Sequence, residues 1–339
     1  MADGMGIRIS GTGSYLPSRT VSNDEIERRA AYDRSRRRGL SLDEWAQAHH
    51  GGRRRHVAAP GEATSDLATR AAERALDDAG LPAGAVDLIV LATFTGDHRL
   101  PQAAAQVQDN LGSRAKFIQV DSACTGFIDA LLVVQALLET GRYGTALVVA
   151  ADVTSMLNDP ADWLPQTVFG DGAGAAVVQP DPSGAGALFI STGSDGHLGR
   201  YVFVPGGGSR QPVSPEVVEQ GLHYWRFRFS EITPWAIERM ASATHDVVRR
   251  AGIRLEDVAL IVPHQASQRI VDGYAEAIGY PRDRVLVTYP ELGNISGASI
   301  PVTLDLARKR GCVSPGEWLL MPAVGAGMAW GAAAYRWSE

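Results

Sequence analysis

Residues 115–141 read AKFIQVDSACTGFIDALLVVQALLETG, a strand-like run followed by a long apolar one. The short run from Lys116 to Val120 is typical of a strand. From Gly126 onward the chain is apolar until Gly141, with few strongly polar positions around the helical circumference, which predicts a helix buried inside a large domain. Cys124 therefore lies at a strand-to-helix corner.

A cysteine at such a corner faces the unpaired N–H groups of the first helical turn and the positive end of the helix dipole. Both favour a thiolate and would stabilise an oxyanion formed when the sulfur attacks a carbonyl. The corner is thus a suitable place for a nucleophile. The alternative is that Cys124 is only a small buried apolar residue, and the corner alone leaves both interpretations open.

The composition is that of an ordinary globular protein: 339 residues, 45% hydrophobic and 21% charged. A net charge of -6 gives no reason to expect nucleic acid or an anionic membrane surface as a partner. The two cysteines, Cys124 and Cys312, cannot build a disulfide framework, and no metal-binding spacing is present. No apolar run approaches the roughly 20 residues that span a bilayer, and no signal-peptide pattern occurs. We therefore expect a cytoplasmic protein without a metal.

The chain contains an internal duplication. DLATRAAERALDDAGLPAGAVDLIVLATF at 66–94 and IERMASATHDVVRRAGIRLEDVALIVPHQ at 237–265 share a helix that ends at a glycine and a buried strand at the same distance beyond it. Alternating helices and apolar strands imply an α/β fold with mostly parallel sheets covered by helices. We predict an N-terminal half, 1–182, and a C-terminal half, 183–339, that meet in the turn-rich stretch PDPSGAG at 180–186.

In a duplicated α/β chain, functional groups gather at the ends of matching strands, where the halves meet. Three candidates lie at such positions. Cys124 follows one strand, His264 ends the apolar run ALIVPH, and Asn294 follows VLVTYPELG. The alternative for His264 is a structural role as a buried, hydrogen-bonded histidine, which is the commoner case for a lone histidine.

A cationic cluster near the N-terminus suggests a ligand. Trp45 is followed by HHGGRRRH at 49–56, which includes Arg53. A ring that can stack on a base, next to guanidiniums that can hold phosphates, would suit a nucleotide-bearing ligand such as coenzyme A.

Five segments resemble the thiolase superfamily, and specifically the β-ketoacyl-acyl-carrier-protein synthase III family of starter ketosynthases. In family order they are DSACTGF around Cys124, FGDGAGAAVV at 169–178, VPHQAS at 262–267, GNISGASIP at 293–301 and GAGMAWGAA at 325–333. The resemblance covers nearly the whole chain. It implies a thiolase-like fold of duplicated helix and sheet layers (αβαβα), and an acyltransferase.

The resemblance also implies roles for the candidates. Cys124 would take an acyl group from a coenzyme A or phosphopantetheine thioester, with the oxyanion held by the N–H groups of Cys124 and Ala326. His264 and Asn294 would stabilise the enolate left by decarboxylation of a malonyl thioester. Attack of that enolate on the acyl-enzyme gives a β-ketoacyl product. Neither a metal nor a cofactor is required.

The substrate-binding positions depart from the family. Trp45 stands where the family has its adenine-stacking tryptophan, but Trp163 replaces the usual flanking arginine. Ser267 replaces the asparagine of HQAN, while Arg53 and Arg269 remain candidates for holding the thioester carrier, either coenzyme A or an acyl carrier protein. Phosphate contact is expected to be weaker than in the family.

The acyl pocket is also expected to differ. Leu100 and Val324 occupy positions where fatty-acid enzymes usually have phenylalanines, and 32–42 resembles an insertion. We therefore expect a ketosynthase of specialised or polyketide metabolism. As in the family, it would be a two-fold homodimer in which Leu100 reaches toward the partner's pocket.

Two other functions remain open. An acyltransferase could load Cys124 and pass the acyl group to an alcohol, amine or carrier thiol, with His264 as base. A non-catalytic partner subunit would need none of the three residues. The presence of Cys124, His264 and Asn294 together favours condensation.

Overall fold

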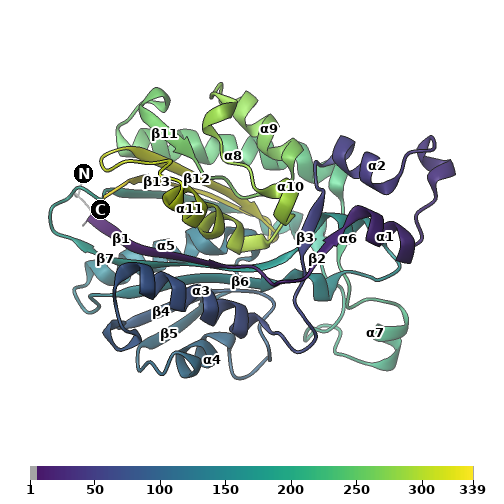
Figure 1. Ribbon diagram of the computed structural model, residues 1–339, viewed down its shortest axis with the longest axis horizontal. Coiled ribbons are helices and arrows are strands. Elements are labelled where there is room, and N and C mark those ends of the chain that lie inside the picture. Colours follow the sequence, from purple (N-terminus) through teal and green to yellow (C-terminus); the bar gives the residue numbers. More distant parts are fainter. Residues whose placement is uncertain (1–5, 339) are drawn as a thin grey trace.

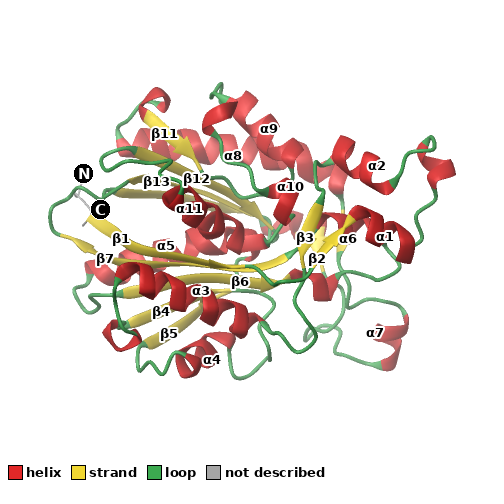
Figure 2. Ribbon diagram, viewed as in Figure 1, coloured by secondary structure: helices red, strands yellow, loops and turns green. Residues whose placement is uncertain are grey.

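A computed structural model describes residues 6–338 as two large β-sheets with three layers of helices, together with two short two-stranded sheets (Figures 1 and 2). The first sheet has five strands, in the spatial order β1 (Gly6–Tyr15), β7 (Asp171–Asp181), β6 (Ala146–Val153), β4 (Leu88–Ala92) and β5 (Lys116–Val120). The second has four, in the order β11 (Val258–Ile261), β12 (Trp318–Gly325), β13 (Ala329–Arg336) and β8 (Leu188–Ser194).

The two sheets repeat one topology. The order β1-β7-β6-β4 corresponds to β8-β13-β12-β11, and the orientation of each neighbouring pair is the same in both sheets. The position of β5 is taken in the second sheet by Val285, which forms a parallel bridge to Ile261. The predicted internal duplication is confirmed, and residues 182–187 connect the two sheets.

The helices form an outer, a central and a second outer layer, as predicted for an αβαβα fold (Figure 1). One outer layer contains α3 (Thr64–Ala79) and α4 (Ala103–Asn110), the other α8 (Phe229–Ala251) and α9 (Gln268–Ala277). Between the sheets lie α5 (Gly126–Glu139) and α11 (Ser299–Lys309). The helices α3 and α8 both end at a glycine in the left-handed conformation, with φ 66° at Gly80 and at Gly252.

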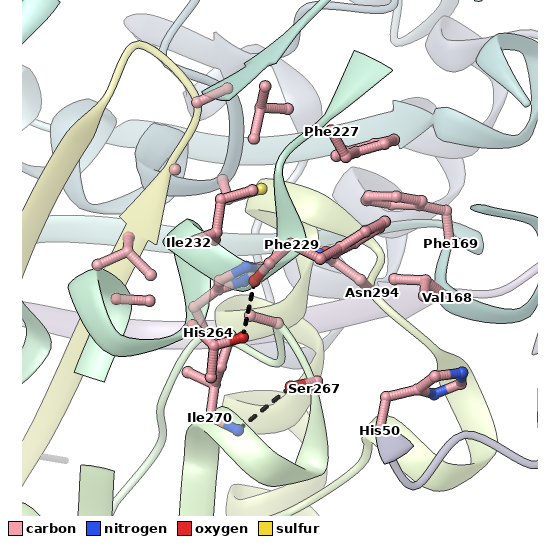
Figure 3. Close-up of a pocket in the computed structure, with 18 of the residues that line it drawn as sticks. His50, Val168, Phe169, Phe227, Phe229, Ile232, His264, Ser267, Ile270 and Asn294 are labelled. Carbon is pink, nitrogen blue, oxygen red and sulfur yellow. Dashed lines mark hydrogen bonds between the residues drawn. The ribbon is translucent and has the colours of Figure 1, made fainter. Parts of the chain in front are cut away.

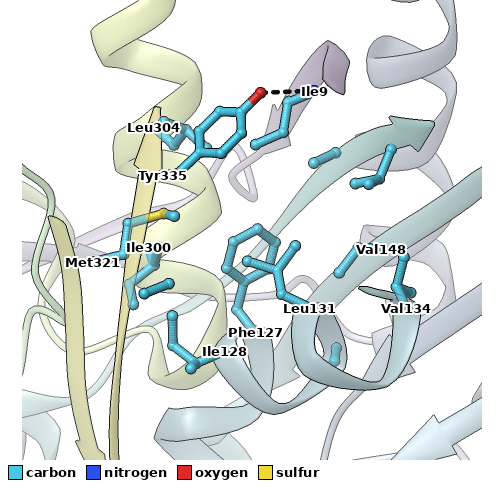
Figure 4. Packing of buried hydrophobic residues seen from close by; sticks show 14 of the residues in the cluster. Ile9, Phe127, Ile128, Leu131, Val134, Val148, Ile300, Leu304, Met321 and Tyr335 are labelled. Atoms are coloured by element: carbon cyan, nitrogen blue, oxygen red, sulfur yellow. Dashed lines mark hydrogen bonds between the residues drawn. The ribbon is translucent and has the colours of Figure 1, made fainter. Parts of the chain in front are cut away.

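The central layer holds the largest apolar cluster (Figure 4). Phe127 and Leu131 of α5 pack with Ile300 and Leu304 of α11 and with Met321 of β12. The predicted burial of α5 is confirmed on one side of the helix, which includes Phe127, Leu131 and Val134, whereas Leu132, Ala136 and Glu139 are exposed. Because α5 and α11 are fixed between two sheets, their N-terminal ends are held in place by packing on all sides.

Shorter elements gather at one end of the layered body (Figure 1). They are β2 (Thr20–Ser22), α1 (Asn23–Arg29), α2 (Leu42–His49), β3 (Arg54–His56), α6 (Trp163–Val168), β9 (Val202–Phe203), α7 (Pro215–Glu219), β10 (Arg226–Phe227) and α10 (Tyr289–Leu292). No helix within residues 6–338 is both long and apolar enough to cross a membrane.

Candidate active site

Cys124 lies at the predicted corner. After β5 the chain forms the 3₁₀ turn η3 (Ala123–Thr125), which leads directly into α5. Ala123 has φ 45°, a left-handed conformation that is uncommon for a residue with a Cβ. The strained turn leaves Cys124 only partly covered and facing a cavity.

The cavity brings the three predicted residues together. Its volume is about 850 Å³, and Cys124, His264 and Asn294 all line it, with Ala326 beside them. His264 and Asn294 lie close to each other in the cavity wall (Figure 3). They come from the ends of β11 and α10, so the first half supplies the thiol and the second half supplies the imidazole and the amide.

Burial makes both titratable groups of this set neutral at rest. It raises the pKa of the Cys124 thiol to about 12, although a hydrogen bond from Ser296 acts in the opposite direction. The thiolate expected from the helix terminus is thus not the resting form, because desolvation outweighs the hydrogen bonds that favour it. Burial also lowers the pKa of His264 to about 3, so the imidazole is uncharged near neutral pH.

Hydrogen bonds orient the imidazole and the amide. Nδ1 of His264 lies 2.7 Å from the Ser299 hydroxyl. When Nδ1 accepts that proton, Nε2 carries a hydrogen that it can donate into the cavity. Oδ1 of Asn294 accepts from the Ser296 N–H at 2.8 Å, which leaves its NH₂ group as the donor. Both side chains can therefore donate to a substrate carbonyl without carrying charge.

Close backbone packing brings the end of β12 against the turn that carries Cys124. A Cβ on Gly325 would lie 3.0 Å from the backbone nitrogens of Cys124 and Thr125, so only glycine allows β12 to approach the turn this closely. The next residue, Ala326, lines the cavity. This arrangement is compatible with the predicted pair of oxyanion donors.

One wall of the cavity is aromatic, which the sequence analysis missed. Phe169 stacks on Trp225 with centroids 4.9 Å apart, and Phe227 stacks on Phe229 at the same separation (Figure 3). The alternating WRFRF at 225–229 was the available signal, since a period of two puts all three rings on one side of the extended segment around β10.

The two predicted acyl-pocket residues have different positions. Val324 is 5% exposed and lines the cavity next to Gly325. Leu100 lies outside this cavity, in the loop before α4, and its side chain is 79% exposed. Within one chain Leu100 is therefore not a pocket residue, and its predicted contact with a partner's pocket stays a prediction.

Aromatic rings at the cavity mouth contact one another. Trp45 lines the mouth and packs edge-on against Trp163, with centroids 4.8 Å apart, while His49 stacks on it at 4.0 Å. Arg37, from the predicted insertion, covers both tryptophans at 5.8 and 5.4 Å. A base stacked on Trp45 would therefore have to displace His49 or Arg37.

The cationic cluster is divided by the fold. Arg55 is 1% exposed and donates to the carbonyls of Val21 and Thr167 and to Asn23, so it is a structural residue. Side chains alternate along β3, so Arg54 points outward while Arg55 points inward. Nε of Arg54 lies 2.5 Å from a carboxylate oxygen of Glu291. The predicted cationic cluster over 49–56 is therefore not one exposed patch, because His50 and Arg55 are buried while Arg53 is exposed.

The predicted carrier-binding residues on α9 are at the cavity. Ser267 caps the helix by accepting from the Ile270 N–H, at 3.2 Å, and Arg269 is exposed. Both line the cavity together with Trp45, whereas Trp163 reaches it only through its contact with Trp45.

Comparison with known proteins gives the family of this chain. Residues 118–196 match the model for 3-oxoacyl-[acyl-carrier-protein (ACP)] synthase III, and residues 248–337 match the model for its C-terminal part. The β-ketoacyl-[acyl-carrier-protein] synthase III of Caldanaerobacter subterraneus subsp. tengcongensis is 38% identical over 100% of both chains. That of Symbiobacterium thermophilum is 40% identical over 98% of both. The chain belongs to the β-ketoacyl-[acyl-carrier-protein] synthase III family. It is therefore an acyltransferase.

Solved structures of this family share the fold. The 3-oxoacyl-[acyl-carrier-protein] synthase III of Aquifex aeolicus superimposes with a TM-score of 0.88 at 33% identity, covering 98% of this chain and 100% of the other. The priming β-ketosynthase of the R1128 polyketide biosynthetic pathway gives 0.87 at 29% identity, covering 99% and 97%. The predicted thiolase-like fold is confirmed.

Proposed function

We propose that this protein loads an acyl group from a thioester onto Cys124 and condenses it with a malonyl thioester, with loss of carbon dioxide. The observation that carries the proposal is the meeting of Cys124, His264 and Asn294 on one cavity of about 850 Å³. The product would be a β-ketoacyl thioester. No metal or bound cofactor takes part in the proposed steps.

In the first step Cys124 attacks the donor carbonyl. The oxyanion develops where the backbone N–H groups of Cys124 and Ala326 can stabilise it. Collapse of this intermediate expels the carrier thiolate and leaves a thioester on Cys124. The thiol must lose its proton in this step, because burial keeps it protonated at rest.

In the second step the malonyl thioester loses carbon dioxide and forms an enolate. Nε2–H of His264 and the NH₂ group of Asn294 would donate to its oxygen. Both donors are neutral before and after the step, so they can stabilise the developing negative charge without gaining or losing a proton. The enolate carbon then attacks the acyl group on Cys124.

The acyl donor is inferred to be larger than acetyl, in a specialised or polyketide pathway. The aromatic wall of the cavity and Val324 at the usual position of a phenylalanine support this inference. The similarity to a priming β-ketosynthase of a polyketide pathway agrees with it. The donor carrier would be coenzyme A or an acyl carrier protein, with Arg269 at the docking surface.

We further infer a two-fold homodimer. β5 is an edge strand of the first sheet, and its residues from Phe117 to Val120 are only partly buried. Leu100, in the loop that precedes α4, is exposed as well. A partner strand would satisfy the open edge. Sedimentation at micromolar concentration tests this inference, and a monomer would exclude it.

The condensation is tested by separating its two steps. In His264→Ala and Asn294→Ala, self-acylation of Cys124 should remain largely intact, whereas release of carbon dioxide from a malonyl thioester should fall by about 100-fold or more. Equal loss of both steps would contradict these roles. Acyl transfer by the wild type without carbon dioxide release would favour the simple acyltransferase.

A further inference from the structure

Ser296 is a strained residue in direct contact with the candidate nucleophile. It begins the 3₁₀ turn η8 (Ser296–Ala298) before α11, is 1% exposed and has φ 54°. Like Cys124, it lines the cavity. The left-handed conformation is uncommon for a residue with a Cβ, whereas glycine adopts it without strain. A serine at this position therefore indicates a use for its hydroxyl.

The hydroxyl of Ser296 donates a hydrogen bond to the sulfur. Its Oγ lies 3.6 Å from Sγ of Cys124, within the reach of a hydrogen bond to sulfur. The backbone of Ser296 is fixed as well, because its N–H donates to Oδ1 of Asn294 at 2.8 Å. A Cβ on the next residue, Gly297, would lie 3.0 Å from the carbonyl oxygen of Ala123. The hydroxyl is thus carried by a turn that packs directly against the turn of the nucleophile.

The other surroundings of the sulfur oppose a negative charge on it. Burial raises the pKa of the Cys124 thiol to about 12, and the charge of Asp152 acts in the same direction. His264, which lines the same cavity, is uncharged near neutral pH, since burial lowers its pKa to about 3. The interactions that lower the thiol pKa are hydrogen bonds from Ser296 and from the backbone N–H of Cys124. A donor at this sulfur therefore contributes more than it would beside an exposed thiol.

We propose that Ser296 is a catalytic residue whose hydroxyl stabilises negative charge on Sγ of Cys124 in both steps of the reaction. The proposal rests on the proposed function and deepens it, because it names a group that stabilises charge on the sulfur rather than on a substrate oxygen. Ser296 keeps its own proton throughout, so it acts as a hydrogen-bond donor and not as an acid or a base. Its hydrogen bond is strongest when the acceptor is a thiolate.

The hydrogen bond acts wherever the sulfur becomes anionic. In acylation the bond from Sγ to the acyl carbon forms, the bond from that carbon to the carrier sulfur breaks, and the Cys124 proton leaves with the carrier thiol. In condensation the enolate carbon bonds to the acyl carbon, and the bond from that carbon to Sγ breaks with its electron pair on sulfur. The thiolate then takes a proton from water. Because the sulfur of the acyl-enzyme is a neutral thioester sulfur, the donor favours the charged states before and after it.

The key variant is Ser296→Gly in a Cys312→Ala background, which leaves Cys124 as the single thiol. Glycine accepts φ 54° without strain and keeps the N–H that holds Asn294, so only the hydroxyl is removed. Loss of a hydrogen bond to a charged group should lower the acid dissociation constant of the thiol about 10- to 100-fold. Since a more basic thiolate is also more nucleophilic, the rate constant of alkylation by iodoacetamide at neutral pH should fall only about three- to tenfold.

Two further measurements distinguish a donor to the sulfur from a structural role. Transfer of a preloaded acyl group from Cys124 to hydroxylamine, followed by intact-protein mass, should slow by a similar factor, since a more basic thiolate leaves more slowly. Carbon dioxide release from a malonyl thioester by unacylated enzyme should stay within about threefold of wild type, because the donors to the enolate oxygen remain in place. Ser296→Ala also lacks the hydroxyl but keeps a Cβ, and it should behave like Ser296→Gly in all three measurements.

Cys312 provides the matched control. It is exposed and outside the cavity, so in a Cys124→Ala background its alkylation rate constant should be the same with serine or glycine at position 296. Wild-type alkylation of Cys124 in Ser296→Gly, or an equal loss of alkylation and carbon dioxide release, would overturn the proposal while leaving Cys124 as nucleophile. Acylation of a Cys124→Ala variant would overturn the proposed function itself. Thermal unfolding shows whether both Ser296 variants fold, and if one does not, the other carries the same measurements.

Discussion

The turns that precede α5 and α11 occupy the same place in the two halves, yet only one of them carries a thiol. The 3₁₀ turn η3 begins at Ala123 and the 3₁₀ turn η8 (Ser296–Ala298) begins at Ser296, and both first residues are left-handed, with φ 45° and 54°. In this correspondence Cys124 of the first half matches Gly297 of the second. Both halves keep a backbone that places one residue at a helix terminus. Only the first half has a candidate nucleophile there, Cys124.

Packing between the two turns explains why the second copy is glycine. A Cβ on Gly297 would lie 3.0 Å from the carbonyl oxygen of Ala123. The first half can therefore present a side chain at this corner only because the second half has none there. The second half contributes instead through Ser296, whose hydroxyl reaches the sulfur, and through His264 and Asn294 at the ends of its own elements.

The strongest test of this asymmetry is removal of the thiol. Cys124→Ala should abolish covalent acylation, because no other thiol lies at a helix terminus facing the cavity. Cys312→Ala is the matched control, since Cys312 is exposed and outside the cavity, and it should acylate like wild type. Intact-protein mass after incubation with acyl thioesters gives the answer. Covalent acylation of the Cys124→Ala variant would show that Cys124 is not the nucleophile.

A second test makes the two turns more alike. Gly297→Ala places a methyl group against the carbonyl of Ala123, so the nucleophile turn must shift. We expect a loss of about 1–3 kcal/mol in the free energy of unfolding and a lower acylation rate, since the turn that carries the reacting sulfur must shift by a few tenths of an ångström. Urea unfolding and rapid quench measure the two quantities.

Gly84→Ala is the control for that substitution. Gly84 has open space around its Cα and no positive φ, so the added methyl group should change the free energy of unfolding by less than about 0.5 kcal/mol. If Gly297→Ala behaves in the same way, the two turns are not packed as tightly as the structure indicates.

A third test concerns the wall that the second half supplies to the acyl site. Val324→Phe should fill part of the cavity and favour acetyl over isobutyryl or longer donors. Discrimination in apolar pockets is about 1–3 kcal/mol per methylene, so the ratio of acylation rates should change by one to two orders of magnitude. Leu100→Phe should act only if a partner chain brings Leu100 to the pocket. An unchanged size profile in Val324→Phe would exclude an enlarged acyl site.

The duplicated fold and three residues of the candidate site could be predicted from the sequence. Repeated spacing from helix to strand predicted the duplicated fold, and strand ends predicted Cys124, His264 and Asn294, because parallel strands bring their carboxyl ends to one edge. Ser296 was missed because its significance depends on a contact with Cys124, which lies 172 residues away in the chain. A lone serine between two helical segments carries no periodic signal.

Charge patterns in the sequence were less informative. Arg53, Arg54 and Arg55 form one cationic run in the sequence, but alternation in β3 buries the last of them in hydrogen bonds to carbonyls. The contact between Trp45 and Trp163 likewise depends on how α2 packs against α6. Identity of residues can be read from a sequence, but which side of a short strand faces inward is fixed by tertiary packing.

The smallest net effect is expected for the pH dependence of stability in the wild type, because the two halves contribute with opposite signs. Asp152 of the first half has its pKa raised by burial to about 7, so between about pH 4 and 7 the folded state holds a proton that the unfolded state has released. His264 of the second half has its pKa lowered by burial to about 3, so between about pH 3 and 6.5 the unfolded state holds a proton that the folded state lacks. Rising pH therefore destabilises through Asp152 and stabilises through His264, each by up to about 1.4 kcal/mol per pH unit.

Single substitutions separate the two contributions. Relative to wild type, Asp152→Asn should gain stability as pH rises from 4 to 7, and His264→Gln should gain stability as pH falls from 6.5 to 4. Urea unfolding at half-unit intervals of pH measures both, and Gly84→Ala, which changes no titratable group, should keep a constant difference from wild type. If the stability differences of Asp152→Asn and His264→Gln from wild type change with pH in the same direction, the protonation states of the two buried side chains are not those that the structure indicates. Slopes of opposite sign would show, without any substrate, that burial keeps Asp152 protonated in the first half and His264 unprotonated in the second.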